Sequence, residues 1–524
     1  MILRVSFAFI SFFIIAHIGA ALTFPDSGMD VLLLFKIWAY YGFMLPKIMV
    51  VFIGIGLITF AIIFRYKNTL YSGKKYGFGR FAQKSDIKKQ NLNFKKGIIL
   101  GKFGRKFIKS NTPLSLLVLA PPGTGKTAGI VIPTLLTIEN SVIVHDPKGE
   151  LYDITKRRRE EISKVYLFDP LSDETSCFNP FAKEMLPKDS RDLRGYILNQ
   201  AAILFKAQKE GDQYFIDAAK SAFLFFTEWL IWKNKETSLP DVRIKLLEDT
   251  NIATTIRTMM VEEGLDADIK RDGNGVLISE DSEKQWAGVV GTLKETIELF
   301  ADPRVIKSTG GKCDFTGDKL REERISVYIK VRAKDQKRLE PLITMLFESI
   351  GTQLISEMPR KDSNQVTFIL DEFVRIGKME IIRDLPAVSR GYNVNSIFIA
   401  QDYEQIAIRY GREAISLFDS NCAYKVIFQQ NNYLSADRIS KLIGNKTEKR
   451  YSDSKSKGSR SISVTNNQNK SVSTSEEGVP LVTTQDILSM QKNNCLIITQ
   501  GFAATPIKAK IPFFFKEQQL KKLI

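Results

Sequence analysis

The sequence predicts a mixed α/β fold: a doubly wound parallel sheet, with a long helical segment inserted between two sets of strands. Short apolar runs that alternate with helix-compatible segments predict the sheet. Between residues 183 and 318 the pattern changes to helical periodicity, which predicts an inserted all-α subdomain. The chain has 524 residues, 44% hydrophobic and 25% charged, so it can build two or three domains with substantial cores and is not a disordered protein.

Two N-terminal segments predict transmembrane helices. Residues 5–24 and 48–64 contain no charged side chain, and each is long enough to cross a hydrocarbon core. Arg4 and a pair of alanines near residue 20 would also suit a signal peptide, but the second apolar segment argues against simple secretion. We therefore expect a membrane anchor with a short external loop.

A basic stretch follows the second apolar segment. Residues 65–109 hold 14 Lys and Arg and one acidic residue, and so supply 13 of the 17 units of net positive charge. The positive-inside rule then places the bulk of the chain in the cytoplasm. Contact with anionic lipid headgroups is our preferred interpretation of these lysines, and contact with DNA is the alternative.

The first apolar run of the sheet, residues 116–119, leads into a sequence typical of a phosphate-binding loop. Its glycines can point successive N–H groups at a phosphate, its lysine can reach the β and γ oxygens, and its last threonine can ligate Mg²⁺. The first position is alanine where the usual pattern has glycine, and alanine is small enough for that turn. The loop consists of Ala120, Pro121, Pro122, Gly123, Thr124, Gly125, Lys126 and Thr127. It predicts binding of a nucleoside triphosphate.

Further strands and helices are expected along the chain. Polar groups, among them Asp146, Lys148 and Glu150, follow the second apolar run at its carboxyl end, where parallel sheets place ligand sites. Strands are expected at residues 141–144, 165–168, 324–329, 366–370, 396–400 and 495–498, and helices at 213–232, 282–300 and 338–358. Trp229, Trp232 and Trp286 lie in the predicted helical segment and are expected to pack its core rather than stack on a base.

An acidic pair, Asp371 and Glu372, directly follows the strand expected at residues 366–370. Opposite a phosphate loop, the first acid would hold Mg²⁺ through its water shell, and the second would polarise the attacking water as general base. Chance helix caps or surface turns can show the same pair, but its combination with the upstream loop favours a hydrolytic site.

Two further candidates lie near the next strand. Gln401 follows the strand expected at 396–400 and could sense the γ-phosphate, although a plain turn residue would look the same. Arg390 could reach across a subunit boundary and stabilise the transition state at the neighbouring site. A plain exposed charge at a helix end is an equally good interpretation of this residue.

A zinc site and a disulfide framework are not expected. The four cysteines are scattered with no CxxC pair, and the chain has two histidines.

Taken in order, the motifs APPGTGKT, VIPTLL, HDPKGE, FNP, ILDEF, SRGY and AQD resemble those of the type IV coupling proteins, the TraG family of conjugation and type IV secretion. The resemblance spans nearly the whole chain and includes the two apolar N-terminal segments and the basic segment YGFGRFA before the loop.

The resemblance implies a RecA-like P-loop ATPase that assembles as a homo-hexamer on the cytoplasmic side of the bacterial inner membrane. It implies ATP and Mg²⁺ as cofactors, with Thr127 and Asp371 at the metal. Single-stranded DNA with its relaxase, or protein effectors, would be the cargo, and accessory proteins and type IV channel components would be the partners. It also implies Gln401 as the sensor glutamine and Arg390 as the trans-acting arginine, and it assigns substrate contact to the helical subdomain.

The expected domains are a membrane anchor at residues 1–65, a first part of the nucleotide-binding domain at 66–182, an all-α subdomain at 183–318, and a second part of the nucleotide-binding domain at 319–524 with a flexible loop at 451–477. Two other functions remain open: a membrane docking receptor that uses nucleotide with little turnover, and a double-stranded DNA translocase of the FtsK type.

Overall fold

The computed structural model describes residues 75–206, 213–248, 251–456 and 469–524. The chain divides into two compact units, the first made of Met1–Phe78 with Asn445–Val479 and the second of Gly79–Gly444 with Pro480–Ile524. Both apolar segments expected to span a membrane lie outside the described residues. Within the described ranges, no helix is long and apolar enough to cross a membrane.

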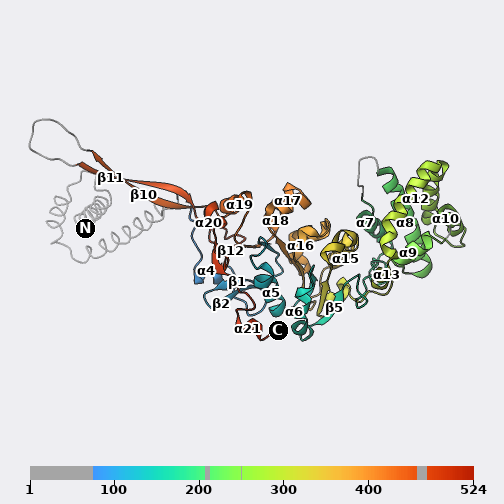
Figure 1. The fold of residues 1–524 in the computed structure, drawn as a ribbon, viewed down its shortest axis with the longest axis horizontal. Coiled ribbons are helices and arrows are strands. Elements are labelled where there is room, and N and C mark those ends of the chain that lie inside the picture. Colours follow the sequence, from blue (N-terminus) through green and yellow to red (C-terminus); the bar gives the residue numbers. More distant parts are fainter. Residues whose placement is uncertain (1–74, 207–212, 249–250, 457–468) are drawn as a thin grey trace, which may run out of the picture. The chain divides into compact units, whose positions relative to one another are not determined.

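A large sheet organises the second unit (Figure 1). Within the described residues it has 11 strands, in the order β2-β1-β13-β12-β9-β3-β8-β7-β4-β6-β5. The seven strands from β9 to β5 are parallel, and β12, β13, β1 and β2 extend the sheet in antiparallel fashion. The strands are β1 Ile98–Phe103, β2 Lys106–Ser110, β3 Leu116–Leu119, β4 Ser141–His145, β5 Lys164–Phe168, β6 Ile325–Ile329, β7 Val366–Leu370, β8 Val394–Ala400, β9 Tyr424–Ile427, β12 Asn494–Thr499 and β13 Ile507–Lys510.

The central strands are buried on both faces, which is why they are nearly continuous apolar runs. Leu117 and Leu119 of β3 belong to one hydrophobic cluster, and Leu116 and Val118 belong to the other. Helices α15 to α18 contribute to the first cluster, and α5 and α6 contribute to the second. The predicted mixed α/β fold is therefore confirmed, and the antiparallel extension of the sheet was not predicted.

The helices outside the β5–β6 connection surround this sheet. They are α4 Lys84–Lys89, α5 Ile132–Thr137, α6 Glu150–Glu160, α15 Gln336–Ser356, α16 Glu380–Tyr392, α17 Tyr403–Tyr410, α18 Arg412–Asn421, α19 Tyr433–Ile443, α20 Thr484–Leu488 and α21 Gln518–Lys521. A π-helical turn, η2 Thr127–Val131, precedes α5, and a 3₁₀ turn, η7 Phe373–Arg375, follows β7.

Between β5 and β6 the described chain is helical, and its helices gather into a cluster (Figure 1). They are α7 Leu193–Leu204, α8 Gln213–Asn234, α9 Leu239–Leu246, α10 Ile252–Met260, α11 Ala267–Leu277, α12 Glu283–Ile297, α13 Pro303–Thr309 and α14 Gly317–Glu322, with short 3₁₀ turns between some of them. Trp229 is buried in their core, and Trp232 and Trp286 pack against that core. The tryptophans therefore serve packing, as expected.

The first unit contains a two-stranded sheet of β10 Asn445–Ser456 and β11 Asn469–Pro480. The sequence predicted a flexible loop over residues 451–477, and this differs from the structure at residues 451–456 and 469–477, which are strands. Backbone hydrogen bonds form a ladder whatever the side chains are, so a polar Ser- and Lys-rich segment can pair as strands. Residues 457–468 lie outside the described part of the chain.

Candidate nucleotide-binding site

The predicted phosphate loop lies at the carboxyl end of β3. Its first residue is anchored to the neighbouring strand, since the Ala120 N–H donates to the carbonyl of Ala400 at 2.9 Å. Gly123 and Gly125 have φ angles of +75° and +81°, which side-chain-bearing residues rarely adopt. Thr124 closes the turn by donating from Oγ1 to the Pro121 carbonyl at 2.7 Å. The loop then runs directly into η2 and α5, so its N–H groups stand at the start of a helix.

The acidic pair lies opposite this loop because β7 and β3 flank β8 in the parallel sheet. Thr127 Oγ1 donates to Asp371 Oδ2 at 3.2 Å. Lys126 Nζ lies 3.1 Å from Glu372 Oε1 and 3.7 Å from Asp371 Oδ1. Lys126 and Thr127 thus each contact an acidic residue that lies at least 244 positions further along the chain.

The two carboxyl groups differ in their electrostatics. Burial raises the pKa of Asp371, and the nearby Lys126 offsets this in part. For Glu372, burial alone would raise the pKa, but Lys126 and Arg375 outweigh it, so the pKa lies below its usual value. Arg375 Nε is 2.9 Å from Glu372 Oε2, so each carboxylate oxygen of Glu372 faces a different cation.

Glu372 has a φ angle of +54°, the left-handed conformation that is uncommon for a residue with a side chain. Backbone strain of this kind costs on the order of 1–3 kcal/mol and persists where the surroundings impose it. The conformation turns the chain sharply between β7 and η7.

The residues here fit a magnesium ion. Asp371 Oδ1 is buried and has no hydrogen-bond partner among the described residues, so it can bind a cation when Lys126, 3.7 Å away, pairs with a phosphate instead. Its other oxygen already holds the Thr127 hydroxyl, so a hydroxyl and a carboxylate stand side by side. Hydroxyl, carboxylate and phosphate oxygens are the ligands that Mg²⁺ prefers.

His145 is a site residue that sequence reasoning did not single out. It ends β4, next to β7, and its Nδ1 donates to the backbone carbonyl of Asp371 at 2.7 Å. The ring is buried, which lowers its pKa to about 4. The available signal was a histidine at the carboxyl end of a strand whose central residues are apolar.

Asp146 builds the turn between β4 and α6. Its Oδ1 accepts from the N–H of Gly149 at 2.9 Å, and its Oδ2 accepts from the N–H of Tyr152 at 2.8 Å. Gly149 has a φ of +79°, and a Cβ there would lie 2.8 Å from the side chain of Lys330. Burial raises the pKa of Asp146 to about 6. The sequence singled out this segment but gave it no role. In the structure, the carboxylate of Asp146 caps the start of α6.

Gln401 and Arg390 lie at opposite ends of β8. Gln401 directly follows Ala400, whose carbonyl holds Ala120, so it stands beside the phosphate loop. Arg390 is exposed near the end of α16, just before β8 begins at Val394. The structure therefore places Gln401 at the site and does not bring Arg390 to the site of the same chain.

Gln430 is a second residue that sequence reasoning missed. Its Nε2 donates to the carbonyl of Leu119, the last residue before the loop, at 3.0 Å. It thereby ties the segment after β9 to the base of the loop.

A parallel sheet with a phosphate loop after β3 and an acidic pair after β7 defines the class of P-loop nucleotide-binding proteins. The chain belongs to the family described as "Type IV secretory system Conjugative DNA transfer", which matches residues 80–523. This match confirms the resemblance drawn from the motifs.

Individual proteins show the same relationship. Protein VirD4 of Rhizobium radiobacter is 28% identical over 494 residues, which cover 90% of this chain and 68% of VirD4. Conjugal transfer protein TraG of Escherichia coli is 25% identical over 452 residues, which cover 80% of this chain and 69% of TraG. The solved structure of plasmid coupling protein TrwB in complex with ADP and Mg²⁺ has a TM-score of 0.55 at 12% identity, covering 83% of this chain and 94% of that chain, and shows the likeness of fold.

Proposed function

We propose that this protein is the ATPase coupling protein of a type IV secretion system, which uses ATP hydrolysis to drive a substrate into the secretion channel. One observation carries the proposal: Lys126 and Thr127 of the phosphate loop face Asp371 and Glu372 across β8. Membership in the conjugative DNA transfer family supports the coupling role.

Each residue has a distinct part in the proposed reaction. The phosphate-loop N–H groups and Lys126 bind the phosphates, and Thr127 and Asp371 hold Mg²⁺, which supplies charge stabilisation for the phosphoryl group. The Lys126 ammonium cannot pair fully with Glu372 and with a triphosphate at the same time. Phosphate binding therefore weakens its ion pair with Glu372. Glu372 Oε1 is then free to accept a proton from the attacking water, while Glu372 Oε2 keeps its ion pair with Arg375. Gln401, beside the loop, senses the γ-phosphate.

We base the proposed cargo and setting on the family. We propose single-stranded DNA with its relaxase as the cargo, because the family is described by conjugative DNA transfer and TraG is named a conjugal transfer protein. A homo-hexamer anchored in the inner membrane, with most of the chain in the cytoplasm, is the proposed assembly. Protein effectors are the alternative cargo.

Steady-state ATPase measurements on the full chain test the proposal. We expect turnover that single-stranded DNA stimulates. Lys126→Ala should lose Mg-ATP binding, and Glu372→Gln should bind Mg-ATP while its turnover falls by about 10²–10⁴-fold. The matched control is Glu322→Gln, which changes an exposed carboxyl and should keep wild-type turnover.

Other outcomes would select other functions. Nucleotide binding by the wild-type protein without turnover would support the docking receptor, and stimulation by double-stranded DNA alone would support the translocase. In donor cells, Lys126→Ala should abolish conjugative transfer while membrane insertion is retained. Unchanged transfer by this variant would contradict the motor function.

A further inference from the structure

An aromatic segment from the far end of the chain lies against the phosphate loop. After β13, the N–H of Phe514 donates to the carbonyl of Ala128, the residue that follows the loop, at 3.0 Å. A Cβ placed on Gly125 would lie 2.5 Å from Cε1 of Phe513, so the Phe513 ring rests directly on the loop. This contact explains why position 125 needs glycine for space as well as for its backbone angle.

The rings of this segment form a stack that reaches the surface. The centroids of Phe513 and Phe515 are 5.5 Å apart with an interplanar angle of 22°. Phe515 is 47% exposed, so its ring is accessible from solvent. Lys516 Nζ lies 5.0 Å from the centroid of Phe513 and 6.0 Å from that of Phe515, so a lysine ammonium stands beside both rings.

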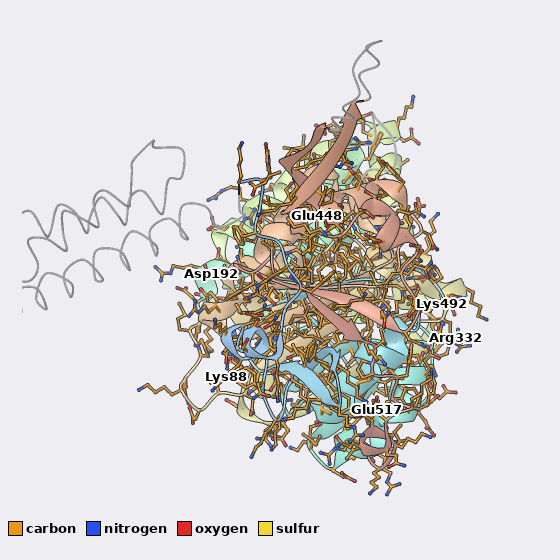
Figure 2. All side chains as sticks on the ribbon, turned by 90° about the vertical axis from the view of Figure 1, so that its left-hand side faces the viewer. Lys88, Asp192, Arg332, Glu448, Lys492 and Glu517 are labelled. Atoms are coloured by element: carbon orange, nitrogen blue, oxygen red, sulfur yellow. The ribbon has the colours of Figure 1, made fainter. Side chains whose placement is uncertain are left out.

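The segment is held in place before any ligand arrives. The N–H of Lys516 donates to the carbonyl of Phe513 at 2.9 Å, which closes a turn. Glu517, labelled in Figure 2, accepts from Lys102 Nζ of β1 at 2.5 and 2.7 Å through its two oxygens. The rings therefore do not have to be ordered on binding, which reduces the entropy cost of stacking.

Sheet order shows which end of a bound nucleotide the rings would meet. The acidic pair after β7 marks the γ-phosphate end, on one side of β3. The strands β9, β12 and β13 lie on the other side of β3, and β13 leads into the aromatic segment. A triphosphate that lies across the loop with its γ-phosphate toward Glu372 directs its nucleoside end toward Phe513 and Phe515.

We propose that Phe513 and Phe515 form the stacking platform for the base of the nucleotide bound at this loop. The inference rests on the proposed function and adds the subsite for the nucleoside. Every base offers a π-face, so a platform of phenylalanine rings binds purine nucleotides of either kind without reading their edges. ATP and GTP are both expected ligands of this subsite.

Calorimetric titrations of the full-length protein with Mg-ATP, Mg-GTP and Mg-tripolyphosphate test the platform. Tripolyphosphate occupies the loop but has no base. We expect Phe515→Ala to raise the Kd for ATP and for GTP by about 5- to 100-fold and to leave the Kd for tripolyphosphate within about twofold. Phe515→Trp, which keeps an aromatic face, should retain wild-type affinity for all three.

A matched control is Tyr214→Ala on α8, because Tyr214 is also 47% exposed but lies in the helical segment between β5 and β6. It should change none of the three affinities. An unchanged Kd for ATP in Phe515→Ala, or an equal loss for ATP and tripolyphosphate, would overturn the platform. Failure of the nucleotide site looks different, since the wild-type protein would then bind none of the three. Failure of the ATPase function alone would show as binding without ATP turnover and would leave the platform intact.

Discussion

The imidazole of His145 fixes the peptide that precedes Glu372: its Nδ1 donates to the carbonyl of Asp371 at 2.7 Å. The contact joins the ends of two adjacent parallel strands, β4 and β7. Because Glu372 has a φ of +54°, rotation of this peptide would move its carboxylate away from Lys126. The buried ring, with a pKa of about 4, stays neutral at physiological pH and donates a single directed hydrogen bond.

His145 is therefore expected to act as a positioning residue for Glu372. His145→Leu should lower kcat by about 5- to 100-fold, the effect of about 1–3 kcal/mol for a lost buried hydrogen bond. The Kd for Mg-ATP should change little, because the loop itself is intact. His145→Asn, whose amide N–H can donate from a similar position, should recover most of the rate. Equal kcat values for the Leu variant and the wild type would contradict this role.

Arg390 is expected to act only across a boundary between two chains. It is exposed near the amino-terminal end of β8, whereas the phosphate loop lies at the carboxyl end of the neighbouring strand β3. Arg390→Ala should lose most of its turnover, since an arginine at the transition state contributes about 10³–10⁵-fold. Mixing Arg390→Ala with Lys126→Ala should restore part of the activity, because some boundaries then join an intact loop to an intact arginine.

The control for this mixture is the exposed Arg412, whose change to alanine should leave turnover unaffected. If the mixture of Arg390→Ala and Lys126→Ala shows no more activity than its two components, Arg390 does not act in trans.

Glu348 is expected to make the protein less stable as the pH rises. This carboxyl group on α15 accepts from the N–H of Ile381 at 3.1 and 3.2 Å through its two oxygens. Burial, with Glu380 and Asp384 nearby, raises its pKa from 4.5 to about 7. Between these two values the folded state binds more protons than the unfolded state, so stability falls as the pH rises through the window.

Thermal unfolding at pH 5 and pH 8 measures this effect. Glu348→Gln keeps an acceptor for Ile381 but cannot ionise, so its gain in Tm over the wild type should be larger at pH 8 than at pH 5. The exposed carboxyl of Glu413 provides the control, and Glu413→Gln should shift Tm equally at both values. A gain for Glu348→Gln that is independent of pH would refute the assignment.

Arg159 is expected to be essential for stability, although it has no carboxylate partner among the described residues. It is fully buried and donates to Ser326 Oγ at 2.8 Å, to the Ile138 carbonyl at 2.6 Å and to the Asn140 carbonyl at 2.7 Å. Arg159→Met would remove the donor from the Ile138 and Asn140 carbonyls, at about 1–3 kcal/mol for each buried group left unpaired, whereas Ser326 Oγ keeps its hydrogen bond to Ser163 Oγ. The midpoint of urea unfolding should fall markedly, whereas Arg157→Met, on the exposed face of α6, should leave it nearly unchanged.

Much of the parallel sheet could be predicted because its strands are short apolar runs with polar ends. The strands at residues 116–119 and 366–370 match β3 and β7 residue for residue. The hairpin of β1 and β2 was not predicted because it lies in the basic stretch, whose lysines we interpreted as contacts for lipid headgroups. In the structure, Lys102 of that stretch pairs with Glu517 and Lys96 pairs with Glu139, contacts that no local pattern shows.

The sequence by itself determined the chemistry available: a phosphate loop, an acidic pair and a glutamine, each placed after an apolar strand. Local residue types carry this information, because a phosphate loop needs its glycines, lysine and threonine in consecutive positions. Tertiary structure decided which other residues surround these groups. His145 behind Asp371, Gln430 beneath the loop and Phe513 against Gly125 are distant in sequence, and only the order of the strands brings them together. The parallel direction of β3 and β8 separates Arg390, which precedes β8, from the loop of its own chain, which follows β3.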